Sequence, residues 1–265
     1  MYRRLDLVAV ALAVWGIVLS RREQRPGGIA LGAAVLTRLW PVVLLPLVAI
    51  ERRTRPIRAL IVTVVVGVAG WLAVGGPGAI REVLTFRGAR GWEVESTVGV
   101  VVWTLTGERR FEQGAFRAGV VPGWARLLLL AALIGGLAAL WWRVRSYPGE
   151  LAGAPALVSV AILLVLSPLL SPGYVIWLLP WGALAAMQDR RWLWLAAAPL
   201  VITGGIMAVW YLDLTEGRPG WSQAALMLRN LAILLIPVVW FAGWVSPGLP
   251  GRARDLSFGG MRSDR

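Results

Sequence analysis

The 265-residue chain contains no histidine and no cysteine, and all 27 of its basic residues are arginine. The missing residue types exclude the usual zinc, haem and iron–sulfur ligand sets, as well as thiol chemistry. Disulfides are excluded too, so cysteine usage does not indicate a redox compartment. A catalytic base must therefore be a carboxylate, a tyrosine or an arginine-assisted group. We expect neither a metal nor a cofactor.

Apolar residues are abundant instead: they make up 58% of the chain, and the mean hydropathy is +0.69. Several apolar runs approach or exceed the length that a membrane-crossing helix needs. The 16 tryptophans fall mostly near the ends of these runs, as in an aromatic belt. The net charge of +13 suits loops that face anionic lipid headgroups, so no nucleic-acid partner is expected. The composition predicts an all-α, multi-pass protein of the cell membrane with about 7–8 membrane helices.

The expected membrane domain covers residues 1–245 and includes a long, polar outer loop at 77–122. An apolar patch at 98–105 within this loop is too short to cross a bilayer, and we expect it to lie along the interface. Residues 246–265 are rich in glycine, proline and arginine, which predicts a disordered cytoplasmic tail.

An arginine and a proline interrupt the apolar run at 27–50, which reads GGIALGAAVLTRLWPVVLLPLVAI. An arginine such as Arg38 at the centre of a spanning helix costs about 2.5–3.5 kcal/mol. Pro41 removes a backbone hydrogen bond and kinks or breaks a helix. Together they favour two half-helices that meet near Arg38, with the charge facing the protein interior. The alternative is one kinked span whose arginine snorkels to the interface.

Arginines in the short loops decide between these alternatives. The loops at 21–25 and 51–58 are both strongly basic, and basic loops stay in the cytoplasm. Both ends of the broken run are then cytoplasmic, which requires a re-entrant pair. The remaining arginine-rich turns at 143–145 and 190–191 agree with this topology.

Three segments then converge on the outer side: Arg38, the loop FRGARGWEVES at 86–96, and LSPLLSPGYVIWLLPW at 166–181. Arginine forks suit phosphate oxygens and carboxylates suit sugar hydroxyls. The prolines and glycine of the third segment break two spans, and such breaks tend to line cavities. The plainer alternatives are a solvated charge cluster for the loop and an ordinary tight turn for the third segment.

The same three segments resemble, in order and spacing, signatures of glycosyltransferase family 87. The run at 27–50 is similar to that family's "GlllGlaaatKlyPlllLPlll", with Arg38 in place of the lysine. The other two resemble "W-Q-x-E-S" and "lSPqYllWLlPl", with Gly173 where glutamine is common; the matching residues are Trp92, Glu95, Ser96, Tyr174, Trp177 and Pro180. The resemblance covers most of residues 6–187 and corresponds to the C-terminal part of such an enzyme.

The resemblance implies a GT-C fold and transfer of a hexose, in this family mannose, from a polyprenyl-phosphate-linked donor to a cell-envelope acceptor. We expect Arg38, Arg87 and Arg90 to bind the donor phosphate. We expect Glu95, Ser96 and Tyr174 to line the sugar site.

Family members carry their catalytic aspartate on an earlier outer loop that has no counterpart here, and Asp6 belongs to the "R-x-D" start of a later helix. No catalytic residue is therefore assigned, and this chain is expected to bind donor weakly without turnover. Two other functions stay open: a lipid or solute transporter or flippase, since broken helices suit that class, and a non-catalytic membrane subunit. An inverted repeat would favour the transporter, and none is evident.

Overall fold

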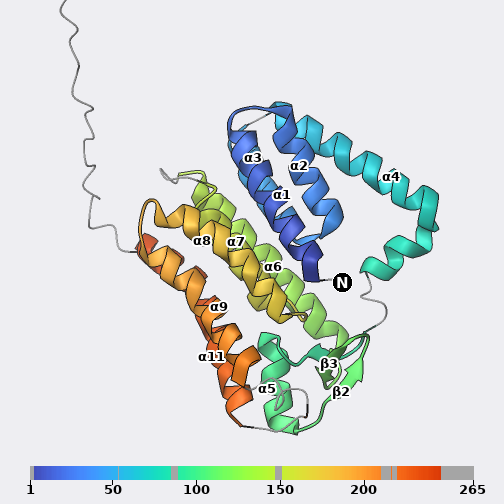
Figure 1. Cartoon of the computed structure of the whole chain (residues 1–265), viewed down its shortest axis with the longest axis vertical. Coiled ribbons are helices and arrows are strands. Elements are labelled where there is room, and N and C mark those ends of the chain that lie inside the picture. The colour runs from blue at the N-terminus through green and yellow to red at the C-terminus, as the bar shows by residue number, and fades with distance from the viewer. Residues whose placement is uncertain are drawn as a thin grey trace, which may run out of the picture.

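The computed structural model describes residues 3–52, 54–84, 89–146, 151–209, 216 and 220–245, and most of these are helical (Figure 1). The N-terminal elements are α1 (Arg3–Arg21), α2 (Arg25–Thr37), the 3-10 helix η1 (Trp40–Leu44), α3 (Leu45–Ile50) and α4 (Thr54–Leu84). A small middle part contains β1 (Trp92–Glu93), α5 (Thr97–Thr106), β2 (Arg110–Glu112) and β3 (Ala115–Ala118). The remaining elements are α6 (Gly123–Val144), α7 (Ala154–Leu166), the 3-10 helix η3 (Pro172–Leu178), α8 (Leu179–Ala186), α9 (Arg191–Val209) and α11 (Trp221–Val245).

Four of the described helices are long and apolar enough to cross a membrane. They are Thr54–Gly78 within α4, then α6, α9 and Trp221–Gly243 within α11. The expected class, an all-α membrane protein, is thereby confirmed. The expected number of membrane helices and the division at residues 77, 122 and 246 stay predictions.

The break in the run at 27–50 falls at the predicted place. Helix α2 ends at Thr37, and Arg38 is extended at φ −150° and ψ 133°. The 3-10 helix η1 follows, with Pro41 in its first turn, where a helix does not need the missing N–H. Leu45 then begins α3, which ends at Ile50.

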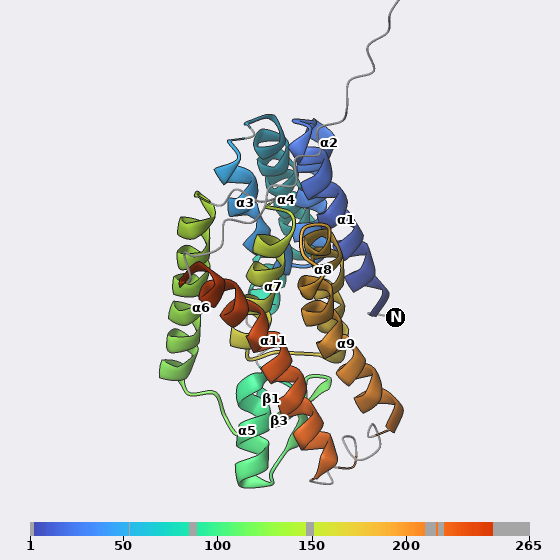
Figure 2. The same ribbon diagram turned by 90° about the vertical axis from the view of Figure 1, so that its left-hand side faces the viewer.

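Both ends of the broken run lie at the same end of the molecule. A Cβ atom on Gly28 would lie against the Pro56 carbonyl, and Gly67 of α4 faces the Leu36 side chain. Since residue 28 contacts residue 56 and residue 36 contacts residue 67, both sequences advance together, and α2 and α4 run in the same direction. The chain between them therefore has to turn back, and α3 does so (Figures 1 and 2). The predicted return of the chain is confirmed, while its insertion into the membrane from the cytoplasmic side stays a prediction.

Helix α4 turns sharply at Gly76 instead of ending there. Gly76 has φ 65°, a left-handed conformation that glycine adopts at little cost, and Pro77 follows it. The chain resumes its helix as far as Leu84. The first part of the expected outer loop at 77–122 is therefore helical.

The rest of that loop folds as a small unit at the lower end of the molecule in Figure 1. Its three strands form an antiparallel sheet in the order β1-β3-β2. The apolar patch at 98–105 lies within α5. One face of this helix buries Val100 and Trp103 in a cluster that includes Leu226 of α11. Whether α5 also lies along a membrane interface is not tested by this packing.

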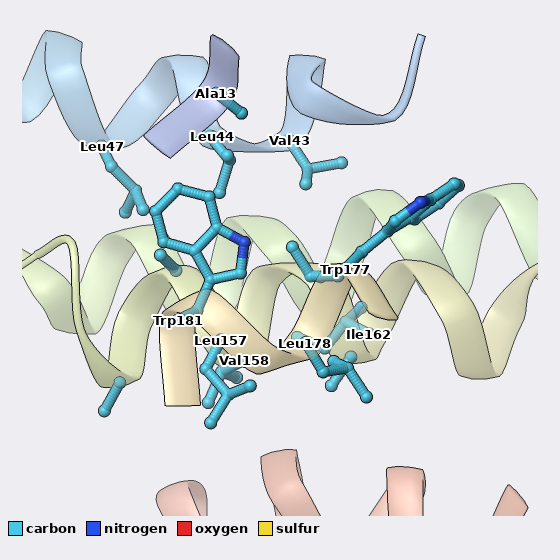
Figure 3. Close-up of a cluster of buried hydrophobic side chains, with 14 of the residues drawn as sticks. Ala13, Val43, Leu44, Leu47, Leu157, Val158, Ile162, Trp177, Leu178 and Trp181 are labelled. Carbon is cyan, nitrogen blue, oxygen red and sulfur yellow. The ribbon is translucent and has the colours of Figure 1, made fainter. Parts of the chain in front are cut away.

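The main core surrounds α7, whose residues from Ala154 to Ile162 are all buried. A helix that is apolar on every face suits such a central position. Figure 3 shows Trp181 of α8 pointing from one side of this core toward Leu44 and Leu47. The Trp181 ring is fully buried, so this core fixes η1 and α3 relative to α8.

Candidate functional site

Arg38 at the break forms a two-point ion pair with Asp6. The Arg38 Nε atom lies 3.1 Å from Asp6 Oδ1, and Nη2 donates to Oδ2 at 3.3 Å. The Asp6 side chain is 8% exposed and that of Arg38 is 30% exposed. The hydrogen bond from Nη2, together with the close approach of Nε, orients the guanidinium group toward the carboxylate. Arg38 therefore points into the protein, as expected, and is an oriented donor rather than a mobile cation.

The helix arrangement explains why these two residues meet. Asp6 lies in the first turn of α1, where the helix dipole favours a negative charge. Arg38 follows the last residue of α2, where the dipole favours a positive charge. Because α1 and α2 pack as an antiparallel pair, the start of one faces the end of the other.

Three aromatic rings form a stack beside this ion pair. The Trp40 and Trp177 ring centroids lie 4.8 Å apart with planes at 14°, and the Tyr174 and Trp177 centroids lie 4.4 Å apart at 25°. Residues three apart are eclipsed in a 3-10 helix, which explains why Tyr174 and Trp177 of η3 stack. The Trp177 indole N–H lies close to the Asp6 carboxylate but does not have the geometry of a regular hydrogen bond.

A cavity of about 270 Å³ opens on the Asp6 side of the stack. Its lining residues are Asp6, Leu7, Pro172, Gly173, Val175, Ile176, Leu200 and Thr203. A Cβ atom on Gly173 would lie 4.0 Å from Asp6 Oδ2, so glycine leaves space open next to the carboxylate. The cavity thus combines one buried carboxylate with mostly apolar walls.

The outer segment, which is the part of the outer loop that follows α4, reaches this region through Glu93. Its backbone N–H donates to the Pro168 carbonyl at 3.2 Å, and β3 places Arg117 opposite it. Burial raises the pKa of the Glu93 carboxyl, while the charge of nearby Arg117 opposes the rise. Tyr174 and Arg229 also lie within electrostatic range of Glu93. The structure therefore brings together the three segments that the sequence singled out.

The predicted sugar-site residues Glu95 and Ser96 have their side chains engaged within the protein. Ser96 is fully buried, and its Oγ accepts from the Gly99 N–H at 3.0 Å as the cap of α5. The same hydroxyl donates to the Glu93 carbonyl at 2.8 Å. The Glu95 carboxylate turns toward α11, where it pairs with Arg229. Their role at a sugar site stays a prediction.

The predicted phosphate ligands on the outer loop are placed only in part. Arg90 is exposed, and its backbone N–H donates to Glu112 at 2.8 Å. Arg87 lies outside the described residues. Their contribution to phosphate binding, like that of Arg38, is untested by this geometry.

Arg229 of α11 is a site residue that sequence reasoning missed. Its guanidinium is fully buried and donates to the Glu95 carboxylate, the Glu95 carbonyl and the Asn230 side chain. Asn230 in turn donates to the same carbonyl at 3.1 Å. This cluster holds the segment after β1 against α11. A lone charge within a 25-residue apolar helix was the signal that would have found it.

Among the described residues, no group of three or more acidic side chains gathers closely enough to hold a metal ion. The sequence model of glycosyltransferase family 87 matches residues 2–172 of the chain. The matched range includes Asp6, Arg38 and the outer segment, and it ends just before Tyr174. Searches of curated proteins and of solved structures found no match.

Proposed function

The chain belongs to glycosyltransferase family 87, a family of membrane glycosyltransferases, and from this premise we propose its donor and the place where the donor binds. The proposed reaction moves a hexose, mannose by family resemblance, from a polyprenyl-phosphate-linked donor to a cell-envelope acceptor. The observation that carries the proposal is the Arg38–Asp6 pair at the break of a re-entrant element, beside an aromatic stack and a cavity.

Such a donor has an apolar chain, one phosphodiester charge and a sugar. Arg38 suits the phosphate because a planar guanidinium matches two phosphate oxygens. Its position among apolar residues lets a lipid chain stay in the bilayer while the phosphate reaches the charge. Asp6 orients the guanidinium before the donor arrives, which lowers the ordering cost of binding. Arg90 and Arg87 on the outer segment are proposed as further phosphate ligands.

The sugar is proposed to lie against Tyr174, whose ring ends the aromatic stack. Glu95 and Ser96 are proposed to line the same site. A sugar hydroxyl that meets the Glu95 carboxylate, which is 13% exposed, would share an oxygen with Arg229, while the buried Ser96 hydroxyl would contribute by fixing the turn that carries Glu95. This sharing is chemically reasonable because a carboxylate or hydroxyl oxygen accepts more than one hydrogen bond.

The charges around the site support binding of one anion. Three acids face three arginines, in the pairs Asp6–Arg38, Glu93–Arg117 and Glu95–Arg229. A raised pKa at Glu93 means that this acid takes up a proton more readily than an exposed glutamate. Protonation of Glu93 removes one negative charge beside these arginines, which favours binding of an anionic phosphodiester.

The test is retention of radiolabelled polyprenyl-phosphate-mannose by the full chain in lipid nanodiscs, followed by incubation with a soluble acceptor analogue. We expect donor retention without sugar transfer, because no residue of this chain is assigned as the base that activates the acceptor. Arg38→Gln should abolish retention, and Arg38→Lys should keep part of it because the charge remains. Arg58→Gln, an exposed arginine on α4, is the control and should behave like the wild type. Unchanged donor retention by a folded Arg38→Gln variant would refute the proposed site. Movement of intact donor across the bilayer would favour the flippase instead.

A further inference from the structure

A second cavity, of about 710 Å³, lies between the end of α3 and the end of α6. It is lined by Pro46, Ala49, Ile50, Arg52, Trp141 and Arg145. These ends are the upper ends of α3 and α6 in Figure 2. Helix α3 leads away from the break at Arg38, so the cavity lies at the other end of the re-entrant element. None of its lining residues belongs to the donor site proposed above.

The lining chemistry is suited to an anion with an apolar part. Arg52 and Arg145 supply two guanidinium groups, and among the described residues no acidic side chain lines the cavity. The buried Trp141 indole N–H has no hydrogen-bond partner within the described structure. A buried donor without an acceptor is costly, and an anionic oxygen that reaches it after a small shift of the lining side chains would satisfy it. Pro46, Ala49 and Ile50 provide an apolar wall.

The Arg145 side chain and the Arg52 backbone both make defined contacts in the described structure. The Arg145 Cζ atom lies 5.4 Å from the centre of the Trp142 ring, a cation–π distance. Arg52 has φ 55°, in the left-handed region where helix ends usually carry glycine or asparagine. Its N–H donates to the Ala49 carbonyl at 3.0 Å. An arginine at this backbone position points to a use for its side chain beyond ending the helix.

The position of the cavity at the end of a candidate membrane span indicates the kind of anion. Helix α6 is one of the four helices long enough to cross a membrane, and Arg145 is the first residue after it. Trp141 lies one turn inside that end. Tryptophan and arginine in this order mark the boundary between acyl chains and headgroups. A ligand here meets lipid phosphates at high local concentration, with acyl chains beside the apolar wall.

We propose that this cavity binds the phosphate headgroup of an anionic membrane lipid. The headgroup phosphate contacts Arg52, Arg145 and the Trp141 N–H, and the upper part of an acyl chain packs against Pro46 and Ile50. The site differs from the general attraction of a basic surface to anionic lipid, because the donors surround a cavity and one of them is a neutral indole.

The test measures lipid retention by the full chain, extracted from vesicles of phosphatidylglycerol and phosphatidylcholine and analysed by native mass spectrometry. The wild type should retain one phosphatidylglycerol in preference to phosphatidylcholine. The double variant Arg52→Gln/Arg145→Gln should lower this preference by about 100-fold, about tenfold for each charge-assisted contact to the phosphate that it removes. The matched control Arg190→Gln/Arg191→Gln removes the same charge from two exposed positions that line neither cavity and should keep the preference.

Trp141→Phe keeps an aromatic ring but removes the indole N–H, so it should weaken retention several-fold without changing the net charge. This variant also decides the matter if the double variant fails to fold. Equal loss in the matched control, together with an unchanged Trp141→Phe variant, would reduce the effect to surface charge and overturn the proposal. Displacement of the lipid by millimolar inorganic phosphate would show that the site takes free phosphate instead.

Discussion

Replacing Arg229 with alanine removes the centre of the cluster that holds the outer segment on α11. Arg229 is completely buried, and its Nη1 atom lies 3.0 Å from the Glu95 carboxylate. The substitution leaves that carboxylate, only 13% exposed, without its cation. It also removes donors from the Glu95 carbonyl and from Asn230. Loss of one partner of a buried ion pair typically costs about 3–5 kcal/mol.

The contacts also predict an order among three variants. Glu95→Ala should cost less than Arg229→Ala, because the guanidinium keeps the Glu95 carbonyl and the Asn230 side chain as acceptors. Asn230→Ala should cost least among the three, about 1–2 kcal/mol, since it removes hydrogen bonds but leaves the ion pair.

Thermal unfolding of the full chain in detergent, followed by tryptophan fluorescence, measures this order. For a chain of this size, 3–5 kcal/mol corresponds to a fall in Tm of about 6–20 °C. Arg126→Ala, on the exposed side of α6, is the control and should cost less than about 0.5 kcal/mol. An Arg229→Ala protein with the same Tm as the wild type would refute this reasoning. So would an Asn230→Ala protein that is less stable than the Arg229→Ala protein.

Three further outcomes are expected. Donor affinity should be highest at low pH and should fall as pH rises through the raised pKa of Glu93, which lies above the ordinary glutamate value of 4.5, because ionisation of Glu93 adds a negative charge beside the site. Glu93→Gln should flatten this profile. A variant profile that runs parallel to that of the wild type would contradict the role given to the Glu93 charge. Cysteines placed singly at Gln24 and Thr54, in a chain with no other cysteine, should be labelled from the same side of a sealed vesicle, and labelling from opposite sides would contradict the re-entrant geometry. Ser96→Ala should lower the free energy of unfolding by about 0.5–2 kcal/mol through loss of the α5 cap, which chemical denaturation would detect.

The break at Arg38 was predictable because its causes are local. A charge and a proline in one apolar run conflict with a continuous helix, and the arginines in the flanking loops indicate the return of the chain. The same reasoning identified the segment around Tyr174, whose prolines and glycine interrupt two spans. Both features depend on residues close together in the sequence.

The partners of these residues were not predictable in the same way. Asp6 pairs with Arg38 across 32 positions, and Glu95 pairs with Arg229 across 134 positions. Each pairing depends on how helices pack, which hydropathy and loop charge do not determine. The small sheet of the outer segment was missed for a related reason: its strands are two to four residues long, too short to show alternation.

The most direct test of the account is an electron cryomicroscopy structure of the chain with a bound polyprenyl-phosphate-mannose. The account predicts the phosphate about 2.7–2.9 Å from the Arg38 guanidinium, the distance of a charge-assisted hydrogen bond, with the hexose against the Tyr174 ring. A donor phosphate, the one that carries the mannose, seated between Arg52 and Arg145 or anywhere else away from Arg38 would contradict it.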